Sequence, residues 1–115
     1  MRLKEEPLVS IVMPVFNSEE TLDQCIESIV SQSFDDWEFI IINDASTDGT
    51  AKKIHYWKNL DSRIIIYANA RNEGVAASLN RGIFQARGKY IARMDADDVS
   101  YKDRLAKQVA FLQAH

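Results

Sequence analysis

The chain has 115 residues, of which 46% are apolar and 27% charged, and its formal net charge at pH 7 is -3. These values fit one globular domain and leave no room for a second domain of ordinary size. The small negative charge gives no basis for nucleic-acid binding or for attraction to an anionic lipid surface.

Cys25 is the only cysteine, which excludes an internal disulfide and the common cysteine-ligated zinc sites. Residues 1–7 form a charged lead-in, and because no apolar segment of the secretory type follows it, we expect no signal peptide. No apolar run approaches the length of a membrane span. The simplest interpretation is a cytoplasmic protein, and attachment to the inner face of the membrane stays open for the full-length protein.

Four apolar runs predict strands, and they cover residues 8–15, 37–42, 63–68 and 89–94. Because the runs are short and apolar on both sides, they are typical of strands buried on both faces of a parallel sheet.

Between these runs the apolar period changes to that of a helix. Asn17 or Ser18 is expected to cap the first helix, the second begins around residues 46–48, and the last begins around Tyr101. Gly88 is expected to end the third helix in a left-handed conformation. The residues predicted to face inward are Leu22, Cys25, Ile26, Ile29 and Val30, then Ala51, Ile54 and Trp57, then Val75, Leu79, Ile83 and Ala86, and finally Leu105, Val109 and Leu112.

The alternation of strands and helices predicts an α/β fold over residues 8–115: a Rossmann-like parallel sheet with helices on both faces. If the fourth strand returns beside the first, the strand order is 3-2-1-4. The crevice between the first and fourth strands is then the switch point at which such sheets bind ligands.

An acidic group, Asp95, Asp97 and Asp98, follows the fourth strand. In an extended segment Asp95 and Asp97 point the same way, and two carboxylates on one side can hold Mn²⁺ or Mg²⁺ together with phosphate oxygens and water. The alternative is that Asp98 or Ser100 caps the last helix while the other acids are solvated.

Two residues at other strand ends are candidates for nucleotide binding. Asp44 follows the second strand, where its carboxylate either accepts an N–H from a nucleobase or closes a local turn or helix cap. Phe16, at the end of the first strand, either covers a base face or packs against the fold.

Several sequence blocks together resemble family-two glycosyltransferases. They are VSIVMPVFN at residues 9–17, IVSQSF at 29–34, INDASTDGT at 42–50, NEGV at 72–75, NRGI at 80–83 and GKYI at 88–91, followed by the acidic group. Their common order over most of the chain makes the resemblance specific, whereas a lone D-x-D motif carries little weight. The resemblance implies a GT-A type fold, of which this chain is the N-terminal, donor-binding part, ending soon after the D-x-D motif.

The resemblance also implies a function: transfer of a sugar from a nucleotide-diphosphate sugar, with a UDP-sugar as the expected donor and a glycan or lipid-linked acceptor. The implied nucleotide-binding residues are Pro14, Phe16, Asn17, Glu19, Asp44, Asn72, Gly74 and Asp95. Asp97 and Asp95 are implied as ligands of Mn²⁺ or Mg²⁺, with Asp98 a weaker candidate. Leu79 departs from the arginine of many relatives, which puts a phosphate contact there in doubt.

Members of this family invert the anomeric centre, and a carboxylate acts as base on the acceptor hydroxyl. That base and the acceptor-binding half are expected beyond His115, so no catalytic residue is expected in this chain; His55 lies too far from the crevice. An apolar face beside the last helix and the fourth strand is expected to favour a homodimer.

Three other classes of protein share parts of this pattern. A phosphoacceptor signalling domain needs an acid pair after its first strand, and residues 14–17 contain none. A nucleotidyltransferase usually has a glycine-rich loop at that place, and no glycine precedes Gly49. A non-catalytic nucleotide-binding or scaffold module of the same fold stays open, although the intact acidic group argues against it.

Overall fold

The computed structural model describes residues 6–115, so most of the predicted lead-in, residues 1–5, lies outside the described residues. Within the described part, strands and helices alternate as expected. The elements are β1 (Val9–Val15), α1 (Leu22–Val30), β2 (Trp37–Asn43), α2 (Thr50–Leu60), β3 (Ile64–Ala68), α3 (Val75–Gln85), β4 (Tyr90–Arg93) and α4 (Arg104–Ala114).

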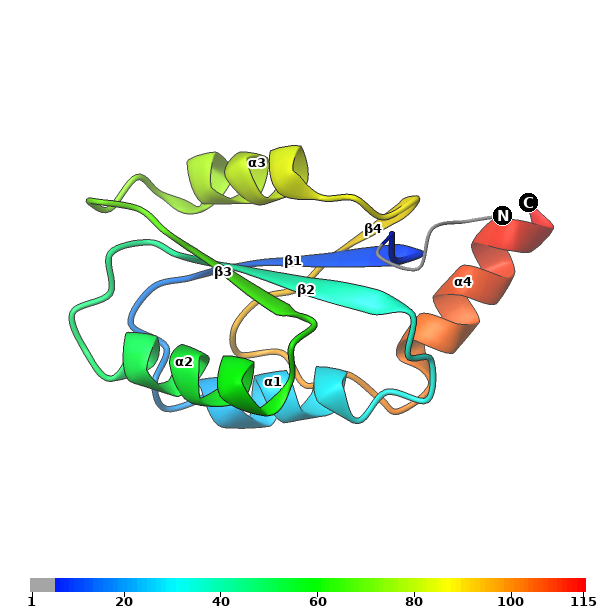
Figure 1. The fold of residues 1–115 in the computed structure, drawn as a ribbon, viewed down its shortest axis with the longest axis horizontal. Helices are drawn as coiled ribbons and strands as arrows, with labels where there is room; N and C mark the ends of the chain where they lie inside the picture. Colours follow the sequence, from blue (N-terminus) through cyan, green and yellow to red (C-terminus); the bar gives the residue numbers. More distant parts are fainter. Residues whose placement is uncertain (1–5) are drawn as a thin grey trace.

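The strands form one parallel sheet in the order β3-β2-β1-β4, which confirms the predicted order. Figure 1 shows that α3 covers one face of this sheet and that α1 and α2 cover the other, so the prediction of helices on both faces is confirmed as well. The loops that follow β1, β2 and β3 lie at the left of this view, whereas α4 lies at the right.

The two central strands, β1 and β2, are buried along their whole length. Because side chains alternate along a strand, Ile11 and Met13 belong to the same core cluster as Leu22 and Ile26 of α1. Val12 lies on the opposite face, beneath α3. The continuous apolar character of these runs therefore reflects helical layers on both sides.

The edge strand β4 differs from its prediction. It covers residues 90–93 rather than 89–94, and its residues alternate between partly buried and exposed. Ile91 is 47% exposed. The apolar run indicated a strand correctly, but a strand at the edge of a sheet is packed less completely than a central one.

Three helix starts differ from the predicted ones because polar turns precede them. The N-cap position of α1 is Thr21, so neither Asn17 nor Ser18 caps this helix. Residues 46–49 form a turn before α2, in which Asp48 Oδ1 accepts a hydrogen bond from the Thr50 amide at 2.9 Å. The N-cap position of α4 is Asp103, and Tyr101 lies exposed before it.

The inward face of α3 was predicted wrongly in part, since Leu79 and Ala86 are partly buried but the other two predicted residues are exposed. Val75 and Ile83 are 57% and 40% exposed, whereas Ser78 and Gly82 are buried. This helix lies so close to the sheet that a β-carbon at Gly82 would collide with Val12 Cγ1, so only small residues fit at the contact.

Two smaller expectations also fail at the helix ends. Gly88 is not left-handed; α3 ends at Ala86 in an extended conformation. A β-carbon at Gly88 would lie 2.6 Å from the Ser10 amide nitrogen, so glycine permits a close approach of two backbones. Leu112 of α4 is exposed, unlike Leu105 and Val109.

None of the helices within residues 6–115 is both long enough and apolar enough to cross a bilayer.

Candidate functional site

A cavity of about 450 Å³ opens at the carboxyl ends of β1 and β4, where the predicted switch point lies. Its lining residues are Pro14, Phe16, Asn17, Ser18, Glu19, Glu20, Thr21, Asp48, Val75, Asp95, Ala96 and Asp97. The cavity thus unites the predicted residues of the β1 end with both predicted metal ligands, although some eighty residues of chain separate the two groups.

Asn17 fastens the end of β1 to the loop between β2 and α2. Its Oδ1 accepts hydrogen bonds from the Thr47 amide at 2.8 Å and the Asp48 amide at 3.3 Å. The backbone amide of Asn17 donates to Ser46 Oγ at 2.9 Å. Asn17 has a φ of 47°, a left-handed conformation that asparagine tolerates better than most residues. The residue thus shapes the cavity wall as well as lining it.

Glu19 lies beside the start of α2. Its amide donates to Asp48 Oδ2 at 3.4 Å, and a β-carbon at Gly49 would collide with Glu19 Oε2. Glycine at position 49 therefore leaves room for the Glu19 carboxylate at this helix end, where the dipole of the helix favours negative charge.

The acidic group adopts a turn, so the prediction of an extended segment is wrong. β4 ends at Arg93, the Asp98 amide donates to the Asp95 carbonyl at 3.0 Å, and Asp98 Oδ2 accepts from the Asp95 amide at 3.1 Å. Asp95 and Asp97 nevertheless both line the cavity. Asp98 closes the turn instead of capping α4, and the Ser100 amide donates to Ser28 Oγ.

The exposed carboxylates of Asp95 and Asp97 fit a metal site that a bound phosphate and water complete better than a site made by protein side chains alone. Within residues 6–115, no three acidic, histidine or cysteine side chains converge closely enough to hold a metal ion by themselves. Two carboxylates suit Mg²⁺ or Mn²⁺ when phosphate oxygens and water complete the coordination shell. In the present conformation Arg93 also contacts Asp95 Oδ1, at 3.3 Å.

Asp44 is not among the residues that line the cavity, although its backbone amide donates to the carbonyl of Val15, between the lining residues Pro14 and Phe16, at 2.9 Å. Only 4% of Asp44 is exposed. Its Oδ1 accepts hydrogen bonds from Asn69 Nδ2 at 2.9 Å and the Glu73 amide at 2.7 Å, and its Oδ2 accepts from the Gly74 amide at 2.9 Å. Burial alone would raise the pKa of Asp44, but these hydrogen bonds bring it below its ordinary value.

Two more of the predicted nucleotide-binding residues, Asn72 and Gly74, lie in the loop to which the Asp44 carboxylate is hydrogen-bonded. Asn72 Nδ2 donates to the Asp44 carbonyl at 3.5 Å, and Gly74 adopts a φ of 94°, which favours glycine. Neither residue lines the cavity, although the adjacent Val75 does. The structure thus divides the predicted nucleotide-binding residues into a cavity group and a supporting group.

Two of the lining residues that the prediction missed connect segments of the cavity wall. Asp48 joins the β1 end to α2, as described above, and Thr21 Oγ1 donates to the Ala96 carbonyl of the acidic turn at 3.0 Å. Asp48 lies inside the INDASTDGT block at residues 42–50, so the resemblance to the family could have indicated it as a site residue. Nothing in the local sequence around Thr21 indicates a contact with a turn 75 residues away.

Cys25 and His55 lie where the sequence placed them. Cys25 is buried, with its Sγ 3.3 Å from Met13 Sδ. Burial, followed by the nearby charges of Asp98 and Asp97, raises the pKa of this thiol to about 12. His55 is exposed on α2.

A second cavity, of about 480 Å³, lies between β4 and α4. Ile91, Phe111 and Leu112 line it and are exposed. The expected apolar face is therefore present, and the pairing of two chains through it stays a prediction.

A parallel sheet of order 3-2-1-4 with helices on both faces defines a protein of the Rossmann-like α/β class, and its cavity lies at the switch point where such sheets bind ligands. Within this class, the chain belongs to glycosyl transferase family 2, whose family model matches residues 10–115.

Relatives in bacteria agree with this membership. EpsE of Bacillus subtilis (strain 168), which its name assigns provisionally to the glycosyltransferases, is 49% identical over 110 residues, covering 95% of this chain and 40% of EpsE. WfgD of Escherichia coli, named as a UDP-Glc:alpha-D-GlcNAc-diphosphoundecaprenol beta-1,3-glucosyltransferase, is 33% identical over 108 residues, covering 94% and 42%. The chain thus spans less than half the length of these relatives.

Solved structures confirm the GT-A type fold. TarS 1-349 of S. aureus in complex with UDP superposes with a TM-score of 0.87 at 26% identity, covering 93% of this chain and 32% of that one. The mannosyltransferase PcManGT of Pyrobaculum calidifontis, in complex with GDP-Man and Mn²⁺, gives a TM-score of 0.86 at 25% identity over the same shares.

Proposed function

We propose that this chain is the donor-binding part of a glycosyltransferase that transfers a sugar from a UDP-sugar to a glycan or a lipid-linked acceptor. The observation that carries the proposal is the cavity in which Phe16, Asn17 and Glu19 lie together with Asp95 and Asp97. The choice of UDP is supported by the TarS complexes with UDP and UDP-GlcNAc. The acceptor class is supported by the diphosphoundecaprenol in the name of WfgD.

Within this proposal the cavity group contacts the nucleotide directly. The exposed ring of Phe16 offers a face to the base, beside Pro14, and Asn17 and Glu19 form the polar wall. The carboxylate of Asp44 holds the loop that carries Val75 to the cavity, and the direct contacts of Asp44, Asn72 and Gly74 with the nucleotide, which the family resemblance implies, stay predictions.

Asp97 and Asp95 would hold Mn²⁺ or Mg²⁺, as the two exposed carboxylates at the cavity allow. When bound, such an ion stabilises the negative charge that develops on the leaving diphosphate. The presence of Mn²⁺ in the PcManGT complex supports this choice.

In the proposed reaction, the bond between the anomeric carbon and the diphosphate oxygen breaks while the acceptor oxygen bonds to the opposite face of that carbon. The configuration therefore inverts. The acceptor hydroxyl gives its proton to a carboxylate base. We assign no residue of this chain to that role and place the base in the portion of the relatives' length that this chain does not match.

Calorimetric titration of UDP into the protein, with and without Mn²⁺, tests the proposal. We expect binding that requires Mn²⁺ and that Asp97→Ala weakens at least tenfold, because one of two protein ligands is lost. Asp35→Ala is the matched control, since Asp35 is also exposed but does not line this cavity. Wild-type protein that ignores UDP under every metal condition, or an Asp97→Ala variant that binds it normally, would contradict the assignment.

A further inference from the structure

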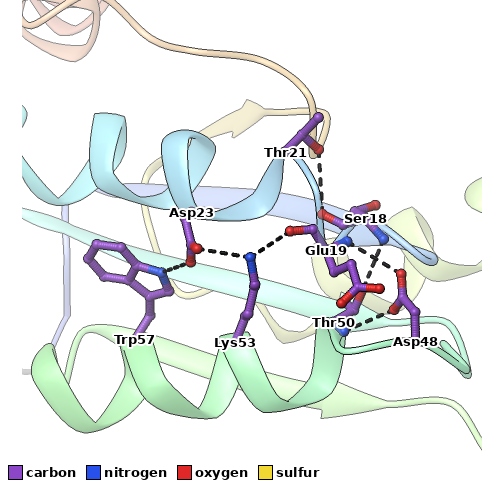
Figure 2. Close-up of polar contacts among 8 residues, drawn as sticks. All are labelled: Ser18, Glu19, Thr21, Asp23, Asp48, Thr50, Lys53 and Trp57. Carbon is purple, nitrogen blue, oxygen red and sulfur yellow. Dashed lines mark hydrogen bonds and ion pairs between the residues drawn. The ribbon is translucent and has the colours of Figure 1, made fainter.

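The loop of residues 16–21, between β1 and α1, supplies half of the residues that line the cavity. It belongs to neither element, and besides the bonds within the loop itself, contacts from other segments hold it in place. The Ser18 amide donates to Thr50 Oγ1 at 2.8 Å, and the Glu19 amide donates to Asp48 Oδ2 at 3.4 Å (Figure 2). These bonds fix the amide side of the loop.

The carbonyl side is held by a chain of contacts that crosses from α2 to α1. Lys53 Nζ donates to the Glu19 carbonyl at 2.8 Å and to Asp23 Oδ2 at 3.0 Å. The other oxygen of Asp23 accepts from Trp57 Nε1 at 2.9 Å. Figure 2 shows Trp57, Asp23, Lys53 and Glu19 in a row along the facing sides of the two helices. We call Lys53, Asp23 and Trp57 the brace.

The brace is too exposed to act mainly as a stabilising ion pair. The side chains of Lys53 and Asp23 are 36% and 53% exposed, and ion pairs of this kind contribute little to the free energy of unfolding. What Lys53 adds is a side-chain bond to the Glu19 carbonyl, in the turn before α1 where the Ser18 and Thr21 carbonyls accept from the Leu22 and Cys25 amides.

The side chains of the brace also restrict one another's positions. The hydrogen bond from Trp57, then that from Lys53, lowers the pKa of Asp23 below its ordinary value, because both donors favour the charged carboxylate. With both carboxylate oxygens occupied, Asp23 limits the positions available to the Lys53 ammonium. The ammonium in turn sets the direction of the peptide that follows Glu19.

We propose that Lys53 is a positioning residue for the nucleotide cavity: through the brace it keeps the 16–21 loop in its binding conformation, although it does not line the cavity. The inference rests on the proposed function. A loop that is ordered before the ligand arrives loses less conformational entropy on binding, so the brace raises affinity without touching the nucleotide.

The test compares Lys53→Met with Lys53→Arg and Lys52→Met. Arginine at position 53 keeps the charge and can donate to both acceptors. Lys52 is an exposed neighbour on α2, so Lys52→Met removes the same charge outside the brace. With Mn²⁺ present, we expect Lys53→Met to weaken UDP binding about three- to tenfold, Lys53→Arg to restore most of it, and Lys52→Met to leave it unchanged. Equal affinities for Lys53→Met and wild type, or equal losses for Lys53→Met and Lys52→Met, would overturn the proposal.

Amide hydrogen exchange at residues 18–21 separates this inference from the proposed function. In the absence of nucleotide, we expect faster exchange there in Lys53→Met, by at least threefold, and unchanged exchange in Lys52→Met. If these amides exchange equally in all variants, the brace does not order the loop, whatever UDP does. If exchange responds as expected but the wild-type protein binds no UDP, the proposed function fails and the role in nucleotide binding fails with it.

Discussion

The Asp44 carboxylate is almost fully buried and accepts hydrogen bonds from Asn69, Glu73 and Gly74. These bonds favour the charged form enough to overcome the cost of burial, and the pKa of Asp44 lies below its ordinary value. A carboxyl group whose pKa is lowered by folding stabilises the protein above its unfolded pKa of about 4. This contribution is lost as the pH falls through the lowered pKa of the folded state.

Asp44→Asn is therefore expected to lower the free energy of unfolding at pH 7 by about 1–3 kcal/mol, because an amide replaces one accepting oxygen with a donor. The difference from wild type should shrink below pH 4, as the wild-type carboxyl group takes up its own proton. Urea unfolding at pH 7 and pH 3 measures both effects. The exposed Asp35→Asn serves as the control, and a difference that grows in acid would contradict the role given to the carboxylate.

The sequence predicted which residues lie close together where their positions depend only on the ends of the strands. Pro14, Phe16 and Asn17 meet Asp95 and Asp97 because the carboxyl ends of neighbouring parallel strands share one edge of the sheet. The buried place of Asp44 was not predictable in the same way. Its partners come from the loop of residues 69–74, whose path depends on contacts that no periodicity records.

At the scale of elements, α3 shows how a helix can be found correctly and oriented wrongly. Its apolar residues repeat at helical spacing, but its fully buried residues are Ser78 and Gly82, of which Gly82 lies against Val12 and Ile42 of the sheet. Hydrophobic periodicity assumes that large apolar side chains face inward. That assumption fails where a helix approaches a sheet too closely for them, as it does above Val12. For β1 and β2, by contrast, burial on both faces makes the apolar run a sufficient signal.

Gly82→Ala tests this close approach. Alanine normally stabilises a helix interior relative to glycine by about 1 kcal/mol. Here we expect the reverse, a loss of about 1–3 kcal/mol in the free energy of unfolding, because the added methyl group would overlap Val12. Chemical denaturation measures the change, and Ala77→Gly at an exposed position of α3 gives the ordinary effect of the same pair of residues. A stabilised Gly82→Ala protein would show that α3 can move away from the sheet freely.

At the scale of the whole molecule, two of the cavities among residues 6–115 differ in their chemistry. The cavity at the switch point is lined by acidic and polar groups, whereas the cavity between β4 and α4 is lined mainly by apolar side chains such as Ile91 and Phe111. The first belongs to the proposed donor site. The second is the surface on which the prediction of a homodimer rests.

Ile91→Lys tests that prediction, because Ile91 is exposed and lines the apolar cavity between β4 and α4. If two chains pair there, the sedimentation coefficient of the wild-type protein rises with concentration, and that of the variant stays at the monomer value because a charge opposes burial. Lys107→Met, on the rim of the same cavity, should leave the association intact. A wild-type protein that stays monomeric at all concentrations would exclude pairing through this face.

The bond from Thr21 Oγ1 to the Ala96 carbonyl joins the 16–21 loop to the acidic turn. Under the proposed function, an ion held by that turn and a nucleotide held by that loop would share this connection as well as a common cavity. In a closed thermodynamic cycle, the factor by which the ion tightens the nucleotide must equal the factor by which the nucleotide tightens the ion. The order in which the two ligands arrive then changes the route to the ternary complex but leaves its total stability the same.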